Sequence, residues 1–161
     1  MSQPTTSSRA AGIVIHNNQL LVIYRKKNDL QYYTFPGGTV EHCESTENCA
    51  AREIFEETSI HVKIKNLVYE LEIIAPNFIK YEYFYLADYI SGTPNLQPTS
   101  VEALRVSSNN IYQPMWMPLE KISGIKLYPI EIRDHIIFDL KNGFLPKTQK
   151  LNLNKSDMKN A

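Results

Sequence analysis

The sequence lacks an excess of charge of either sign, because its 161 residues include 17 Lys and Arg against 17 Asp and Glu. This balance excludes a strong overall attraction to nucleic acid or to an anionic membrane surface. No apolar run approaches the length of a membrane span, and the Ser/Thr-rich beginning lacks the apolar segment of a secretory signal. We therefore expect a cytoplasmic protein that binds neither a nucleic-acid polymer nor a membrane. A phosphate-bearing ligand would need local cations or a metal ion.

Cysteine is also scarce, and its spacing does not indicate a metal site. Cys43 and Cys49 are the only cysteines, and they form no CxxC pair. This favours free thiols in a reducing cytosol over a disulfide or a zinc site. The length fits one domain with a substantial core, which we assign to residues 10–146. We expect residues 1–9 to form a flexible polar tail and residues 147–161 to form a frayed, Lys/Asn-rich tail.

The remaining pattern is one of strands and two main helices, without regular βαβ repetition. Strands are predicted at Ala10–His16, Leu20–Tyr24, Tyr32–Phe35, Val62–Ala75, Phe78–Ile90 and Ile111–Met117, with turns at Asn17-Asn18 and Pro76-Asn77. Helical segments are predicted from near Ser45 or Thr46, at Pro118–Ile122 and at Ile130–Leu140. Residues 91–110 read as a long polar loop. The pattern predicts an α/β fold in which a mixed β-sheet lies between helices.

One predicted helix concentrates acidic residues on a single side. Glu53, Glu56 and Glu57 fall in a sector of about 100°, because residues three and four apart share a helix face. Carboxylate oxygens crowded in this way suit a hard ion such as Mg²⁺ or Mn²⁺. A solvated acidic face would have the same spacing. The opposite face, expected to pack on the sheet, carries Ala50, Ala51, Ile54 and Phe55.

The residues around this acidic face resemble the Nudix box. Gly38 is followed after five residues by Glu44, and after seven more by the run REIFEETSI, which begins at Arg52 and ends at Ile60. The family pattern is G, five residues, E, seven residues, then REUxEExGU, with U a bulky aliphatic residue. Every fixed position matches except Ser59, which stands where the pattern has glycine. So many fixed residues at fixed offsets make the resemblance to this MutT-like family specific.

The resemblance implies the Nudix fold, an α/β/α sandwich, and hydrolysis of a nucleoside diphosphate linked to another group X. It implies an Mg²⁺ or Mn²⁺ cofactor that neutralises the pyrophosphate oxygens and lowers the pKa of a bound water molecule. By this analogy Glu53 and Glu57 are direct metal ligands, and Glu56 also lies at the metal. The backbone carbonyl group of Gly37 or Gly38 completes the ligand set.

The resemblance assigns supporting roles to other charged residues. Arg52 orients the catalytic carboxylates and Glu44 braces the loop, and their charges also fit a purely structural ion pair. Glu41 is either a further carboxylate near the metal or part of the loop surface. For the general base, Glu102 is the candidate, since it is the only acidic residue in the 91–110 loop. Glu56 is the alternative base, and a solvent-exposed role for Glu102 stays open.

Ser59 is the residue that departs from the pattern. The box glycine is expected just past the helix, where a left-handed backbone is favoured. Serine can adopt this conformation at a cost of about 1 kcal/mol. We therefore expect a small loss of stability and intact metal chemistry.

Clues to the substrate are fewer. Arg25, Lys26 and Lys27 follow the second predicted strand and could meet phosphate oxygens, although a solvated strand end fits equally well. The substrate candidates are nucleoside triphosphates, including oxidised ones, and conjugates such as ADP-ribose. A different class of function is a sensor with the same fold that binds a nucleotide derivative without cutting it. A homodimer formed through the aromatic strand is an open expectation.

Overall fold

The computed structural model describes residues 4–155. Its strands are β1 (Thr5–His16), β2 (Gln19–Lys27), β3 (Leu30–Thr34), β4 (Gly37–Thr39), β5 (His61–Ala75), β6 (Phe78–Ser91), β7 (Asn110–Pro118), β8 (Leu127–Tyr128) and β9 (Gln149–Asn154). Its helices are α1 (Thr46–Thr58), α2 (Val101–Arg105) and α3 (Ile130–Asn142), with a 3₁₀ helix at Leu119–Gly124. Within the described residues, no helix has the length and apolar character needed to cross a membrane.

Strand β1 lies at the centre of the mixed sheet, whose order is β8-β3-β2-β1-β6-β5-β9. It runs parallel to β6 over residues 5–14 and antiparallel to β4 over residues 9–11. Its last two residues pair with β2 across a turn in which Asn17 and Asn18 both have positive φ. Such a turn matches the twist of the flanking strands, which confirms the predicted hairpin.

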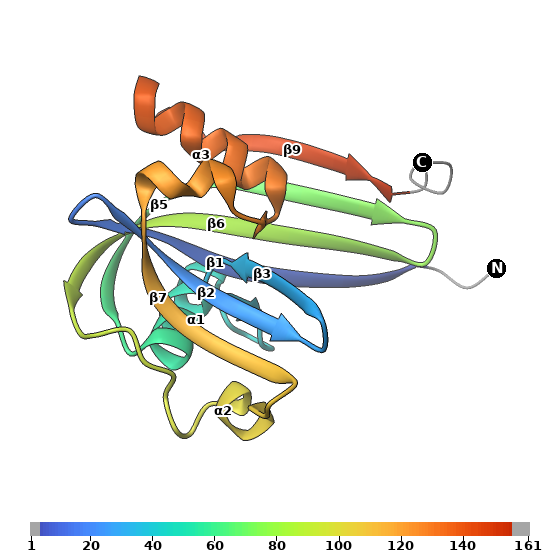
Figure 1. The fold of residues 1–161 in the computed structure, drawn as a ribbon. Helices are drawn as coiled ribbons and strands as arrows, with labels where there is room; N and C mark the ends of the chain where they lie inside the picture. Colours follow the sequence, from blue (N-terminus) through green and yellow to red (C-terminus); the bar gives the residue numbers. More distant parts are fainter. Residues whose placement is uncertain (1–3, 156–161) are drawn as a thin grey trace.

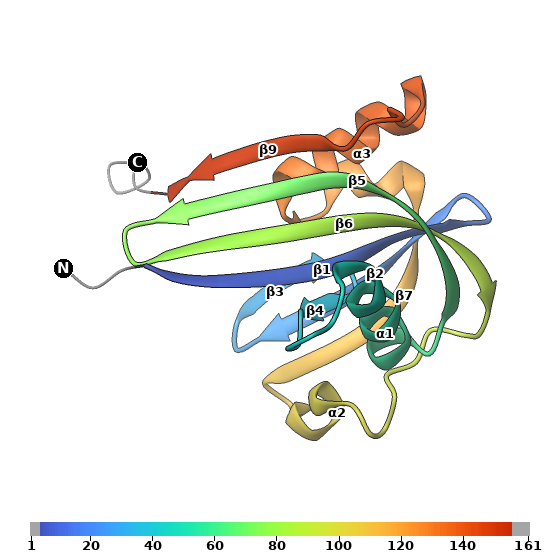
Figure 2. The ribbon, with the colours of Figure 1, turned by 180° about the vertical axis from the view of Figure 1, so that it is seen from behind.

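Helices cover both faces of this sheet, as Figures 1 and 2 show from opposite sides. The core against α3 includes Phe35, Tyr69, Leu71, Phe84, Ile132 and Ile136. The core against α1 includes Ala10, Val14, Leu21, Cys49, Ala50 and Ile54. The expected arrangement of a mixed sheet between helices is therefore confirmed.

Helix α1 begins where its capping residue predicts. The Ser45 hydroxyl oxygen accepts a hydrogen bond from the Asn48 amide at 3.1 Å, which satisfies one of the free N–H groups of the first turn. Ala50 and Ile54 are fully buried against the sheet. Phe55, expected on the same face, is instead 36% exposed, and its ring packs against His61 with centroids 4.6 Å apart.

The prediction of two tails is wrong for most of the tail residues that the structure describes. Residues Thr5 to Arg9 belong to β1 and pair in register with β6. At the other end, Gln149–Asn154 forms β9, which runs parallel to β5 at the edge of the sheet. Leu151 and Leu153 alternate with exposed polar residues and pack on the core. The Lys/Asn-rich composition concealed this period of two; residues 1–3 and 156–161 lie outside the described residues.

Strand β7 and the segment before it fit the sequence in part. Among the described residues β7 pairs with β2 alone, so Pro114 lies on an edge strand, as its missing N–H requires. The sequence predicts only a loop between β6 and β7. This stretch contains α2, which begins at the capping residue Ser100, whose Oγ accepts a hydrogen bond from the Ala103 amide. Figure 1 shows this segment beside the end of α1.

Candidate active site

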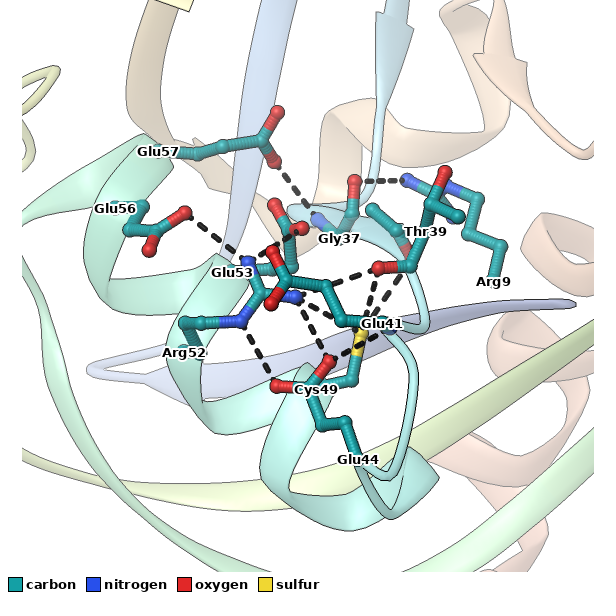
Figure 3. A network of polar contacts seen from close by, with 11 residues as sticks. Arg9, Gly37, Thr39, Glu41, Glu44, Cys49, Arg52, Glu53, Glu56 and Glu57 are labelled. Carbon is teal, nitrogen blue, oxygen red and sulfur yellow. Dashed lines mark hydrogen bonds and ion pairs between the residues drawn. The ribbon is translucent and has the colours of Figure 1, made fainter. Parts of the chain in front are cut away.

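Arg52 lies at the centre of the polar network drawn in Figure 3. Its guanidinium group holds Glu44 with two hydrogen bonds, from Nε to Oε1 at 2.8 Å and from Nη2 to Oε2 at 2.9 Å. This forked contact lowers the pKa of the Glu44 carboxyl group to about 2. Glu44 Oε2 also accepts a hydrogen bond from the Glu41 amide at 3.0 Å. The arginine therefore ties α1 to the loop that precedes it.

The same guanidinium group reaches two of the carboxylates on the acidic face. Its Nη1 atom donates to Glu53 Oε1 at 2.9 Å and to Glu56 Oε2 at 3.2 Å. Glu53 is nearly buried, at 9% exposure, whereas the Glu56 side chain is 42% exposed. The positive charge offsets the repulsion between these two carboxylates, and the hydrogen bonds fix their direction.

Glu57 is held in a different way, from the strand side of the site. Its Oε2 atom accepts a hydrogen bond from the Gly37 amide at 2.8 Å, and the residue is 7% exposed. Burial raises the pKa of the Glu57 carboxyl group to about 8 and also raises the pKa of Glu53. Two buried carboxyl groups side by side favour a nearby cation.

The two glycines of β4 permit this close packing. A Cβ atom on Gly38 would collide with the Glu53 carboxylate, and one on Gly37 would collide with the backbone of β1. The Gly37 carbonyl oxygen accepts a hydrogen bond from Arg9 Nη2 at 3.0 Å, and the same nitrogen donates to the Phe35 carbonyl at 2.9 Å. Arg9 therefore holds the turn that presents the Gly37 amide to the acidic helix.

The chemistry of these donors suits a hard divalent ion, because carboxylate and carbonyl oxygens are its preferred ligands. Their side chains are not gathered around a single position for a metal ion. Within residues 4–155 there is no group of three or more His, Cys, Asp or Glu side chains close enough to hold a metal ion. Arg52 engages oxygens of Glu53 and Glu56, and the Gly37 amide engages Glu57. The residue types fit Mg²⁺ or Mn²⁺, and their side chains would have to turn toward it.

A cleft of about 340 Å³ opens beside Glu57 and Gly37. It brings together charges of both signs from distant parts of the chain: Arg9, Arg25 and Lys80 with Glu57, Glu82 and Glu102. The negative charge of Glu102 contributes to the raised pKa of Glu53 and Glu57, so the α2 segment lies near the acidic face of α1. Carboxylates and cations thus share one cleft.

The sequence also matches a known protein family. The NUDIX domain family matches residues 6–139. The chain belongs to the Nudix family. The match includes all but the first residue of β1 and most of α3, and it contains the box from Gly38 to Ile60.

Individual Nudix relatives resemble the chain in parts. It is 33% identical over 103 residues to an ADP-ribose pyrophosphatase of Methanocaldococcus jannaschii, covering 62% of this chain and 61% of that protein. It is 39% identical over 67 residues to a MutT-like protein of Streptomyces ambofaciens, covering 41% and 42%. The chain thus spans less than two thirds of the length of either relative.

The fold is also that of known Nudix structures. The crystal structure of a NUDIX hydrolase from Nitrosomonas europaea superposes with a TM-score of 0.69 at 18% identity, over 96% of this chain and 82% of that one. At this identity the likeness concerns the fold.

The structure separates the predicted substrate residues. Arg25 lines the cleft, and its guanidinium carbon lies 3.3 Å from the centroid of the Tyr112 ring. Its Nη2 atom donates to Asn110 Oδ1 at 3.3 Å. Lys27 and Glu41 are exposed and are not among the residues that line this cleft.

Arg9, Lys80 and Tyr112 were missed by the sequence reasoning. Arg9 was assigned to a tail, and the other two lie on strands whose neighbours depend on sheet order. One signal was available for Lys80, which forms an ion pair with nearly buried Glu82 two residues away. Residues two apart on a strand share a face.

A second cavity of about 550 Å³ adjoins the cleft and shares Lys80, Glu82, Tyr128 and Pro129 with it. Its other lining is largely apolar and includes Ile73, Phe78, Ile130 and Leu153. A charged cleft therefore continues into an apolar cavity, an arrangement suited to a ligand with an anionic part and a less polar part.

Proposed function

We propose that the protein is a metal-dependent hydrolase that cleaves the pyrophosphate bond of a nucleoside diphosphate linked to another group X. The products are a nucleotide and a phosphorylated compound. The observation that carries this proposal is the cleft that Glu57, Glu82 and Glu102 line together with Arg9, Arg25 and Lys80. Opposite charges in one cleft can bind an anionic phosphate and the cation that accompanies it.

The metal ion is assigned to the acidic face of α1. Glu53, Glu56 and Glu57 would supply carboxylate oxygens to it, and the carbonyl group of Gly37 or Gly38 would supply a further one. When bound, Mg²⁺ or Mn²⁺ neutralises pyrophosphate charge and lowers the pKa of a bound water molecule. The protein orients the carboxylates through Arg52 and the Gly37 amide.

Glu102 is proposed as the general base that accepts a proton from the attacking water molecule. It lies on a segment separate from α1 yet lines the same cleft as Glu57. The rival candidate, Glu56, has one carboxylate oxygen engaged by Arg52. A base must come within hydrogen-bond reach of the proton it removes, and the place of Glu102 in the lining of the cleft supports this role.

The cationic side chains are proposed to bind the phosphate groups, and the adjoining apolar cavity to take the less polar part of the substrate. Arg9 and Arg25 line the cleft, and a guanidinium group can bind two phosphate oxygens at once with the N–H groups that its protein contacts leave free. The archaeal relative is named as an enzyme that acts on ADP-ribose. The substrate candidates for this chain are therefore ADP-ribose-like conjugates and nucleoside triphosphates, including oxidised ones.

The test is product release from a panel of common and oxidised nucleoside triphosphates, ADP-ribose, a dinucleoside polyphosphate and NADH, each with Mg²⁺, with Mn²⁺ and with chelator. We expect turnover of at least one compound, abolished by chelator. Glu57→Gln should lower kcat at least about 100-fold, since even partners behind metal ligands cost 10- to 100-fold. Glu47→Gln, an exposed change in the first turn of the same helix, is the matched control.

Two outcomes would contradict this function. Full activity of Glu57→Gln would remove the acidic face from the mechanism. Tight binding of a panel compound without turnover would instead indicate a nucleotide sensor with this fold.

A further inference from the structure

The one residue that breaks the Nudix box pattern makes contacts that glycine could not make. Ser59 ends α1 with φ 59° and ψ 17°, a left-handed conformation, and its amide donates to the Phe55 carbonyl at 2.8 Å. The expected strained backbone is therefore present. Its hydroxyl group donates to the Asn95 carbonyl at 2.6 Å and accepts from Gln97 Nε2 at 2.8 Å. Both partners lie in the segment that leads to α2.

Backbone contacts reinforce this attachment on both sides of the hydroxyl group. The Asn95 amide donates to the Thr58 carbonyl at 2.9 Å, and the Gln97 amide donates to the Glu56 carbonyl at 3.1 Å. These carbonyls belong to the last turn of α1, which has no internal partners for them. The segment 92–100 is thus fastened to the carboxyl end of the helix that carries the acidic face.

The attachment leads directly to Glu102. The Gln97 carbonyl accepts a hydrogen bond from the amide of Ser100, the capping residue of α2. Ser100 is nearly buried, and its Oγ accepts from the Ala103 amide at 3.1 Å. Glu102 stands in that first turn and lines the cleft with Glu57. A short chain of contacts therefore connects Ser59 to the position of this carboxylate.

We propose that Ser59 is a positioning residue whose hydroxyl group holds the 92–100 segment on α1 and so places Glu102 over the cleft. The proposal rests on the proposed function, because it gives Glu102 a part in hydrolysis. A serine hydroxyl can donate one hydrogen bond while accepting another, and Ser59 uses both capacities toward one segment. Serine at this position therefore adopts a strained left-handed backbone and in return forms two hydrogen bonds that glycine cannot form.

A matched pair of variants separates the hydroxyl group from the backbone strain. Ser59→Ala keeps a Cβ atom in the left-handed conformation and loses the hydroxyl, whereas Ser59→Gly loses the hydroxyl and relieves the strain. Ser59→Gly should therefore melt at a higher temperature than Ser59→Ala. Both should lower kcat by a similar factor, between about 5 and 100, because small displacements of a catalytic group have effects of that size. Thr99→Ala, an exposed change in the same segment, should keep wild-type kcat.

A second background tests whether Ser59 acts through Glu102. In Glu102→Gln, kcat should already be reduced, and adding Ser59→Ala should lower it little further, since residues acting as one unit are not additive. Loss of kcat by the same factor in both backgrounds would overturn the positioning role. Full kcat in Glu102→Gln alone would overturn it as well and would leave the hydrolase proposal in place.

Hydrogen exchange supplies a readout that needs no turnover. The amides of Asn95 and Gln97 should exchange faster in both Ser59 variants than in wild type, with exchange in the sheet unchanged. Unchanged exchange at these amides would show that the hydroxyl group does not hold the segment. If wild type turned over no compound, the proposed function and the catalytic part of this inference would fall together. The exchange result would still decide whether the attachment exists.

Discussion

At the scale of residues, two arginines organise the site from opposite sides. Arg52 belongs to α1 and distributes its guanidinium nitrogens over Glu44, Glu53 and Glu56. Arg9 belongs to β1 and binds two backbone carbonyls in the turn that presents the Gly37 amide. The first aligns side chains, and the second fixes backbone. Only the first was expected from the sequence, because only Arg52 stands at a fixed position of the box.

Arg9→Met should loosen the turn before α1. Two partly buried carbonyl groups lose a charged donor, and such hydrogen bonds contribute about 1.5–3 kcal/mol each. Because one nitrogen donates to both carbonyl groups, the two contributions overlap, and we expect the free energy of unfolding, measured in urea, to fall by about 2–4 kcal/mol, with kcat reduced as well. Arg9→Lys keeps the charge but not the planar fork, so its loss should be intermediate. Equal stability of all three proteins would contradict the role given to Arg9.

Glu44→Gln should reveal a pH-dependent part of the stability. The pKa of Glu44 is lowered from 4.5 to about 2 in the folded protein, chiefly by its hydrogen bonds with Arg52. A lowered folded-state pKa stabilises the protein above the unfolded value, and this contribution is lost as pH falls through the folded value. The difference in unfolding free energy between wild type and variant should therefore shrink between about pH 5 and pH 2. A difference that stays constant over this range, in urea unfolding at several pH values, would argue against the pairing.

At the scale of elements, the sequence predicted the helix start and the turn that depend on one or two neighbouring residues. Ser45 or Thr46 marked the start of α1, and the Asn17-Asn18 pair marked a hairpin. Strand β9 was missed, because its polar composition resembles a frayed tail and only its pairing with β5 makes it a strand. Edge strands take much of their stability from the neighbour beside them.

Leu151→Ala tests whether β9 is part of the folded sheet. Leu151 is partly buried and packs on the core, so its truncation should lower the free energy of unfolding by about 1–2 kcal/mol. Lys150→Ala, on the same strand as Leu151, removes an ion pair between an exposed lysine and Glu70 of β5 and should cost less than about 1 kcal/mol. Thermal and urea unfolding of both variants measure this contrast. If neither variant changed the free energy of unfolding, the result would favour the predicted tail over a strand.

At the scale of the whole molecule, the site depends on sheet order. The box predicted the acidic face of α1, Arg52 and Glu44, because these residues lie within one short stretch of sequence. The cations opposite them come from β1, β2 and β6, and Glu102 comes from α2. Their convergence follows from the parallel pairing of β1 with β6 and from the attachment of the 92–100 segment to α1. Neither relation has a local signal in the sequence.

The sheet also brings the two ends of the described chain to one place. Thr5 pairs with Phe78, and Asn154 pairs with Ile74, so both ends flank the turn at Pro76-Asn77. Figure 2 shows both ends on the same side of the molecule. The two ends of the described residues are therefore near each other, and a linker could join them while the chain was opened at the exposed Asn17-Asn18 turn. Such a circular permutant would keep every strand pairing and lose only the covalent connection between β1 and β2. It would change the order of the strands along the chain, and so the order in which they can fold, without altering the cleft.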